Sequence, residues 1–214
     1  MHIPDGILPA QVCAAGYAVT GLATWYSLRQ INRKPDPTAE IPKASLLTAA
    51  FFVASSIYIP VPPASVHLIL NGLLGVVLGY FAFPAILIGL FFQALVIGHG
   101  GITTLGVNAA MMGIPALLAH HIFRSRNRVG KMLAEPTRTG VFAFLGGAVG
   151  LGLAALIFLA LIVLNIPAEL DAGAERAAVV TLTIAHIPLA IVEGIFTAML
   201  VLFLRRAKPE LLEG

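Results

Sequence analysis

Apolar residues run along this chain in long stretches that are separated by short polar segments. A helix needs about 20 mostly apolar residues to cross a bilayer, so stretches of this length predict membrane spans. The predicted spans are Ile7–Leu28, Ala44–Ile59, Val66–Ala82, Pro84–Gly98, Thr103–Phe123, Gly140–Leu164 and Ala177–Leu204. The pattern therefore predicts an all-α membrane protein with seven transmembrane helices, forming a single domain over residues 1–214.

The region Val66–Gly98 decides the number of spans. It is one apolar run of 33 residues, which is too long for a single crossing. Pro84 lacks a backbone N–H and disfavours helix at the residue before it. We therefore expect a break at Phe81-Ala82-Phe83-Pro84, with two short helices in a tight hairpin.

Basic residues test this count. All of the 13 Lys and Arg residues except Arg176 lie in three segments, at residues 29–43, 124–138 and 205–208. The positive-inside rule places such segments in the cytoplasm. Seven spans put all three on one side, whereas six would send residues 124–138 outside. The prediction is an amino terminus outside, a cytoplasmic carboxyl terminus and a multi-pass location in the cell membrane.

Composition supports this class of protein. Hydrophobic residues make up 58% of the chain and charged residues 11%, whereas a soluble domain is about a quarter charged. The lone Cys13 excludes an internal disulfide framework. Topology accounts for the net charge of +3, so we expect no nucleic-acid partner.

The first two residues form a candidate chelator. The α-amine of Met1, the amide nitrogen of His2 and the His2 imidazole can close a five-membered and a six-membered ring on one metal ion. Three nitrogens in a plane leave one equatorial position for another imidazole, and a tetragonal set of nitrogens suits Ni(II) or Cu(II). The alternative is a disordered chain end, as is common at termini.

Two more histidines lie at the predicted outer face. His67 opens the third predicted span, with Asn71 one helical turn further on the same face. His99 lies in the run Gly98–Gly101, and we interpret it as a residue that orients a metal ligand rather than as a ligand. Gln93, Asn108 and Thr103–Thr104 are candidates for the same hydrogen-bonded network.

The last predicted span carries His186 and Glu193, two turns apart on one helix face, with Pro188 between them. One interpretation is a cation pathway or a proton-linked pair. The other, which we favour, is a buried polar cross-link that fixes helix packing.

The sequence lacks enzyme motifs. It contains neither a His-Glu-x-x-His pair, nor a Gly-x-Ser-x-Gly elbow, nor a Gly-x-x-x-x-Gly-Lys phosphate loop. We therefore expect a non-enzymatic metal-binding protein that works passively, couples to an ion gradient or borrows an ATPase. One rival is a stand-alone, ion-coupled divalent metal permease that uses His186 and Glu193. Another is a haem- or quinone-binding electron carrier, which the gathering of histidines at one face disfavours.

Several motifs together resemble the CbiM/NikM family, the substrate-binding components of energy-coupling-factor cobalt and nickel transporters. They are Met1-His2-Ile3-Pro4-Asp5-Gly6, Ser65-Val66-His67, Asn71-Gly72-Leu73-Leu74-Gly75-Val76, Gly98-His99-Gly100-Gly101 with the following Ile102-Thr103-Thr104-Leu105-Gly106-Val107-Asn108, and Ala185-His186-Ile187-Pro188. The resemblance covers nearly the whole chain.

The resemblance implies that Co(II) or Ni(II) is the transported substrate and that no redox cofactor is needed. It places the metal on Met1, His2 and His67. It implies a membrane-embedded coupling protein, two cytoplasmic ATPases and often a small accessory membrane protein as partners, in the cytoplasmic membrane of a prokaryote. His99, Asn71, Asn108, His186 and Glu193 remain candidates for supporting or pathway roles.

Overall fold

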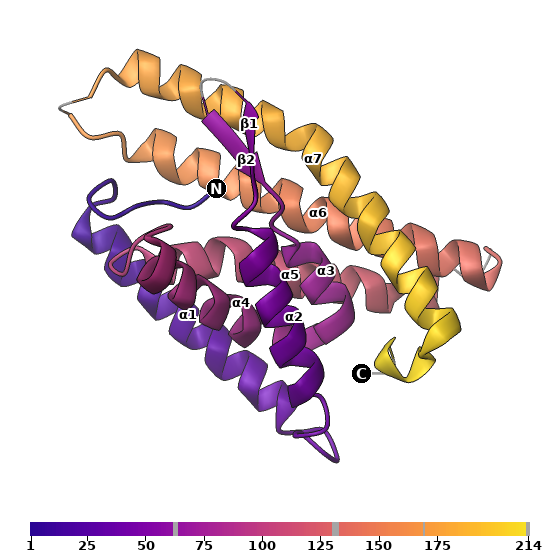
Figure 1. Ribbon diagram of the computed structural model, residues 1–214. Helices are drawn as coiled ribbons and strands as arrows, with labels where there is room; N and C mark the ends of the chain where they lie inside the picture. Colours follow the sequence, from indigo (N-terminus) through magenta and orange to yellow (C-terminus); the bar gives the residue numbers. More distant parts are fainter. Residues whose placement is uncertain (62–63, 130–132, 169, 213–214) are drawn as a thin grey trace.

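The computed structural model describes residues 1–61, 64–129, 133–168 and 170–212, and most of these are helical (Figure 1). Its elements are α1 (Ala10–Ile31), α2 (Ile41–Ala54), β1 (Tyr58–Val61), β2 (Ala64–His67), α3 (Asn71–Leu78), η1 (Gly79–Phe81), α4 (Ala82–Phe92), η2 (Gln93–Ile97), α5 (Leu105–Val129), α6 (Glu135–Leu164), α7 (Ala172–Ala207) and η4 (Pro209–Leu212). Helix α5 lies at the centre and packs against α1, α3, α4 and α6, while α7 packs along α6.

Four helical segments of the described chain are long and apolar enough to cross a membrane. They are Asn71–Ile97, Leu105–Val129, Glu135–Leu164 and Ala172–Ala207, and the apolar α2 is shorter. Helix α3 is buried at every position, as expected for a helix enclosed by others in a bundle. The structure is therefore that of a largely helical membrane protein.

The segment Asn71–Ile97 doubles back on itself. A straight helix of its 27 residues would be about 40 Å long. Yet the rings of His67 and His99, which flank the segment, have centroids only 5.2 Å apart. The chain reverses at Gly79, whose φ of 60° is accessible to glycine at little cost. The predicted hairpin is confirmed, but the break precedes Pro84, which lies in the first turn of α4, where its missing N–H costs nothing.

The prediction of an all-α fold needs one correction. Strands β1 and β2 form an antiparallel hairpin in which Tyr58 pairs with His67. Helix α2 ends at Ala54 rather than at Ile59, and His67 ends a strand instead of opening a helix. The predicted shared helix face of His67 and Asn71 is therefore wrong. Tyr, Ile and Val residues favour strand, and they are frequent in residues 57–66. Such short apolar runs cannot be told from helix by hydropathy, and here they form strands rather than helix ends.

The three basic segments meet at one end of the molecule. Lys43 Nζ donates to the carbonyl of Leu211, at 3.0 Å, which joins the start of α2 to the carboxyl-terminal turn. Arg205 forms an ion pair with Glu135, which joins the end of α7 to the start of α6. In Figure 1 the end of α7 and the α1–α2 connection lie at one end of the bundle, away from the amino terminus.

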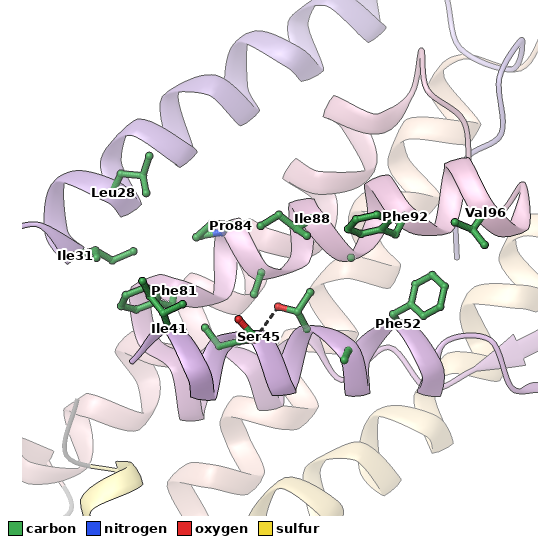
Figure 2. A pocket seen from close by; sticks show the side chains of 15 residues that line it. Leu28, Ile31, Ile41, Ser45, Phe52, Phe81, Pro84, Ile88, Phe92 and Val96 are labelled. Atoms are coloured by element: carbon green, nitrogen blue, oxygen red, sulfur yellow. Dashed lines mark hydrogen bonds between the residues drawn. The ribbon is translucent and has the colours of Figure 1, made fainter. Parts of the chain in front are cut away.

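An apolar groove of about 600 Å³ runs along α2 and α4 (Figure 2). Leu28 of α1 lies near one end of it, and Phe52 of α2 lies towards the other. No titratable side chain is among its described lining residues, and Ile88 in its wall is half exposed. The groove is thus apolar surface of the kind that faces a bilayer, and the histidines lie elsewhere.

Candidate metal centre

The amino terminus is anchored inside the protein. Met1 is only 5% exposed and Ile3 is fully buried. Asn108 of α5 clamps Ile3 on both sides of its backbone, with Oδ1 accepting from Ile3 N at 2.9 Å and Nδ2 donating to Ile3 O at 3.0 Å. The hydroxyl of Thr104 also donates to Ile3 O, at 2.6 Å. The alternative of a disordered chain end therefore does not hold.

Hydrogen bonds to Asp5 hold the amino-terminal segment against the connection that precedes α5. Its carboxylate accepts from the backbone N–H groups of Ile102, at 3.2 Å, and Thr103, at 2.9 Å, and also from the Thr103 hydroxyl. These hydrogen bonds hold the pKa of Asp5 below its usual value. A Cβ on Gly101 would lie 2.0 Å from Asp5 Oδ1, so this position requires glycine. The Gly98–Gly101 run thus lets the terminal segment approach closely.

Three imidazoles meet beside the terminal amine. His2, His67 and His99 each offer one ring nitrogen, and these nitrogens lie within 4.8 Å of one another. The ring centroid of His2 lies 5.1 Å from that of His67 and 4.0 Å from that of His99. The Met1 nitrogen lies 3.1 Å from His67 Nε2. The structure therefore brings the three predicted outer-face histidines and the amino terminus to one place.

The hydrogen bonds of His2 select one of its ring nitrogens for a metal. His2 Nε2 forms a hydrogen bond with Gln93 Oε1, at 2.8 Å. The Gln93 amide nitrogen donates to the Ser55 hydroxyl, and this hydroxyl donates to the carbonyl of Phe51, at 2.8 Å. Each group in this relay donates to the next, which assigns the proton to Nε2. Nδ1 is then left with a lone pair, and it is buried with no hydrogen-bond partner within the described part of the chain. Nδ1 is the atom that closes the six-membered ring of the predicted chelate.

His67 is oriented in a comparable way. Its Nδ1 lies 3.2 Å from the carbonyl of Leu68, which places the proton there and directs the Nε2 lone pair towards the terminal amine. Two ligands at right angles, each about 2.0–2.1 Å from a metal, stand about 2.9 Å apart. The 3.1 Å between Met1 N and His67 Nε2 is close to that separation.

Burial keeps these nitrogens unprotonated. It lowers the pKa of the Met1 amine from 8.0 to about 5 and that of His67 to about 3. Burial also lowers the pKa of His99 to about 4 and shifts that of His2 well below its usual value. The cluster is therefore neutral at pH 7, and a metal ion can bind the amine and imidazoles without displacing protons from them.

The remaining predicted residues divide into two groups. Asn108 and Glu193 bond the backbone next to candidate ligands, with Glu193 accepting from the N–H groups that follow His67. Asn71 instead donates to carbonyls of α5 and α6, and His186 Nδ1 bonds within its own helix, at 2.7 Å. Ser55 was not predicted, although a polar residue within a predicted apolar span was an available signal.

Buried neutral nitrogen donors in a bundle of apolar helices are a donor set that suits a divalent transition metal. A family model described as "Cobalt uptake substrate-specific transmembrane region" matches residues 2–211. The chain belongs to this family, which confirms the resemblance seen in its motifs.

Relatives match over nearly the full chain. One from Haemophilus influenzae is 37% identical over 99% of this chain and 97% of its own length. The cobalt transport protein CbiM of Sorangium cellulosum is 30% identical over 100% of this chain and 95% of its own length. The fused nickel transport protein NikMN of Rhodobacter capsulatus is 32% identical, and the match covers 99% of this chain and 64% of that protein.

Solved structures agree in fold. A crystal structure of a transition metal transporter superposes with a TM-score of 0.81 at 26% identity, covering 97% of this chain and 93% of that one. A truncated transition metal transporter gives a TM-score of 0.80 at 26% identity, over 97% and 99% of the two chains. The chain is thus a cobalt/nickel transport membrane component.

Proposed function

We propose that this protein is the substrate-binding component of an ATP-driven, energy-coupling-factor uptake system for Co(II) or Ni(II). The observation that carries the proposal is the buried amino terminus, whose amine lies 3.1 Å from His67 Nε2. Beside it is His2 Nδ1, which has no hydrogen-bond partner among the residues that the structure describes. The metal ion is the transported substrate rather than a resident cofactor. Neither redox chemistry nor an enzymatic step is required.

The metal is held by four nitrogens. These are the Met1 amine, the deprotonated His2 amide, His2 Nδ1 and His67 Nε2. The tridentate amine–amide–imidazole chelate fixes a plane, and the imidazole of His67 completes it, which suits Ni(II) and also accommodates Co(II). His99 packs against both rings and helps to orient them.

In this proposal the site faces the outside of the cell. The chain crosses the cytoplasmic membrane of a prokaryote seven times, with the amino terminus outside and the carboxyl terminus inside. The meeting of all three basic segments at one end of the bundle supports this orientation, because such segments face the cytoplasm.

Transport requires partners that supply energy. The sequence has no phosphate-binding loop, so in this proposal two cytoplasmic ATPases supply the energy. A membrane-embedded coupling protein links them to this chain, and systems of this type often include a small accessory membrane protein. Capture by the terminal segment precedes an ATP-driven reorientation that releases the metal inward.

The rival function, a stand-alone ion-coupled permease, needs His186 and Glu193 to act as a proton-linked pair. Both Glu193 oxygens are instead engaged by the backbone N–H groups of Ile69 and Leu70, at 2.5 and 3.0 Å. His186 Nδ1 is engaged by the carbonyl of Leu182. These contacts favour structural roles for both residues.

Binding and transport can be tested separately. The purified chain should bind Ni(II) and Co(II), with His67→Ala weakening binding at least about 100-fold and His186→Ala much less. In proteoliposomes, metal uptake should require the ATPases and ATP. Uptake by the chain alone, without ATPases or ATP, would instead establish the permease.

A further inference from the structure

We infer that Glu193 of α7 is a positioning residue for the metal ligand His67, an inference that rests on the proposed function. Glu193 is 1% exposed and lies 124 positions from Ile69 in the chain. Its Oε1 accepts from Ile69 N at 2.5 Å, and its Oε2 accepts from Leu70 N at 3.0 Å. One carboxylate thus fixes the backbone two and three residues beyond the candidate ligand.

This piece of backbone needs outside support. Leu70 has a φ of 56°, and it is the one non-glycine residue with positive φ in the described chain. Such a conformation is costly for a leucine and persists where its surroundings hold it. Leu70 also immediately precedes α3, whose first N–H groups have no acceptor within the helix. A carboxylate at that helix end accepts hydrogen bonds and meets the positive end of the helix dipole.

The same segment sets the direction of the His67 ring. His67 Nδ1 bonds the carbonyl of Leu68, so the ring follows the backbone that Glu193 holds from the other side. His67 Nε2 must stay near the 3.1 Å that separates it from the Met1 nitrogen if both are to bind one ion. A shift of about 1 Å in the segment would therefore misplace the ligand while leaving its chemistry intact.

Two alternative roles for Glu193 would give different results. The carboxylate is close enough to the Met1 amine to interact with it electrostatically, so it could attract the metal ion by charge alone. It could also stabilise only the packing of α7 against β2 and α3. An effect of charge would persist without the His67 imidazole, whereas an effect on packing alone would leave metal affinity unchanged.

A double-mutant cycle distinguishes these roles. Affinity for Cu(II), which binds nitrogen sites most tightly of the divalent series, is measured in the full-length chain so that weakened variants remain measurable. Glu193→Gln replaces one acceptor oxygen with an NH₂ group that faces a backbone donor. We expect it to weaken binding about 10–100-fold in the wild-type background. In the His67→Ala background we expect less than about a twofold change.

The Cu(II) d–d absorption band gives a second measurement. Loss of an equatorial imidazole moves this band, so Glu193→Gln should move it towards the position found for His67→Ala. Thr197→Val is the matched control, because Thr197 is fully buried one turn further along α7 and its hydroxyl donates within that helix, to Glu193 O at 2.7 Å. The control should change neither affinity nor band.

The inference is overturned if Glu193→Gln weakens binding equally in both backgrounds, or if it leaves affinity and spectrum unchanged. Should Glu193→Gln not fold, Glu193→Asp keeps the charge but shortens the reach, and we expect it to weaken binding in the wild-type background alone. Failure of the wild-type chain to bind Cu(II), Ni(II) or Co(II) would instead overturn the proposed function itself.

Discussion

The pH dependence of metal affinity follows from the burial of the terminal amine. An amine with the usual pKa of 8.0 is about 90% protonated at pH 7, so a metal ion would have to displace that proton. Burial lowers the pKa of the Met1 amine to about 5, and about 99% of it is then unprotonated at pH 7. His2 and His67 are unprotonated there too. In the proposed chelate, the proton on the His2 amide is therefore the one that leaves on binding.

The loss of metal affinity on acidification depends on how many protons binding releases. Loss of the amide proton alone lowers the affinity constant about tenfold per pH unit, or about 100-fold from pH 8 to pH 6. A solvent-exposed amine would add about 50-fold over the same interval, for a total of about 5,000-fold. Metal affinity should therefore fall about 100-fold from pH 8 to pH 6. Its dependence on pH should become steeper only as the pH approaches about 5, the pKa of the buried amine.

Calorimetry measures directly how many protons are released when the metal ion binds. Titration of the purified chain with Ni(II) at pH 7, in buffers with different ionisation enthalpies, counts the protons released. We expect about one proton per metal ion. Release of about two would mean that the amine is protonated before binding, which would refute the argument from burial.

Three substitutions test the supports of the site. Gln93→Ala should weaken binding about 10–100-fold, because the bond that orients the His2 ring is lost, and isothermal titration would measure it. Asn108→Ala removes both amide contacts to Ile3 and should cost about 1–3 kcal/mol of binding free energy, seen as increased exchange of the Ile3 amide and lower affinity. Gly101→Ala would drive a Cβ into Asp5, so metal binding should be lost while circular dichroism remains unchanged.

Asn165→Ala is a control for the two amide variants. Asn165 Nδ2 donates to Leu161 O at 2.8 Å, so this change also deletes an amide hydrogen bond, but at the end of α6. Its metal affinity should equal that of the wild type. Equal losses in Asn165→Ala and Asn108→Ala would show that general destabilisation, rather than release of the terminal segment, weakens binding.

The sequence was sufficient to predict the components of the site because their signals are local. An amine followed by His2 is a chelator whatever the fold, and the glycines around His99 indicate close backbone approach. The apolar run Val66–Gly98 is too long for one crossing, and the basic segments lie on one side only if this run crosses twice. Both features predicted a hairpin between His67 and His99. Together these features predicted that distant histidines meet at one face, and the structure brings them together.

The contacts that orient the ligands could not be predicted in the same way. Hydropathy does not distinguish a four-residue strand from the end of a helix, so His67 was assigned to a helix. The bonds of Glu193 to Ile69 and Leu70 join residues more than 120 positions apart. They depend on how α7 packs against β2 and α3, which no local pattern records.

In the proposed site the free amino terminus is itself a metal ligand. The most direct measurement compares Ni(II) affinity of the native chain with that of a chain carrying one extra residue before Met1, with thermal unfolding as the check on folding. We expect the extension to abolish binding at micromolar metal and to leave the fold intact. Retention of native affinity by the extended, folded chain would contradict it.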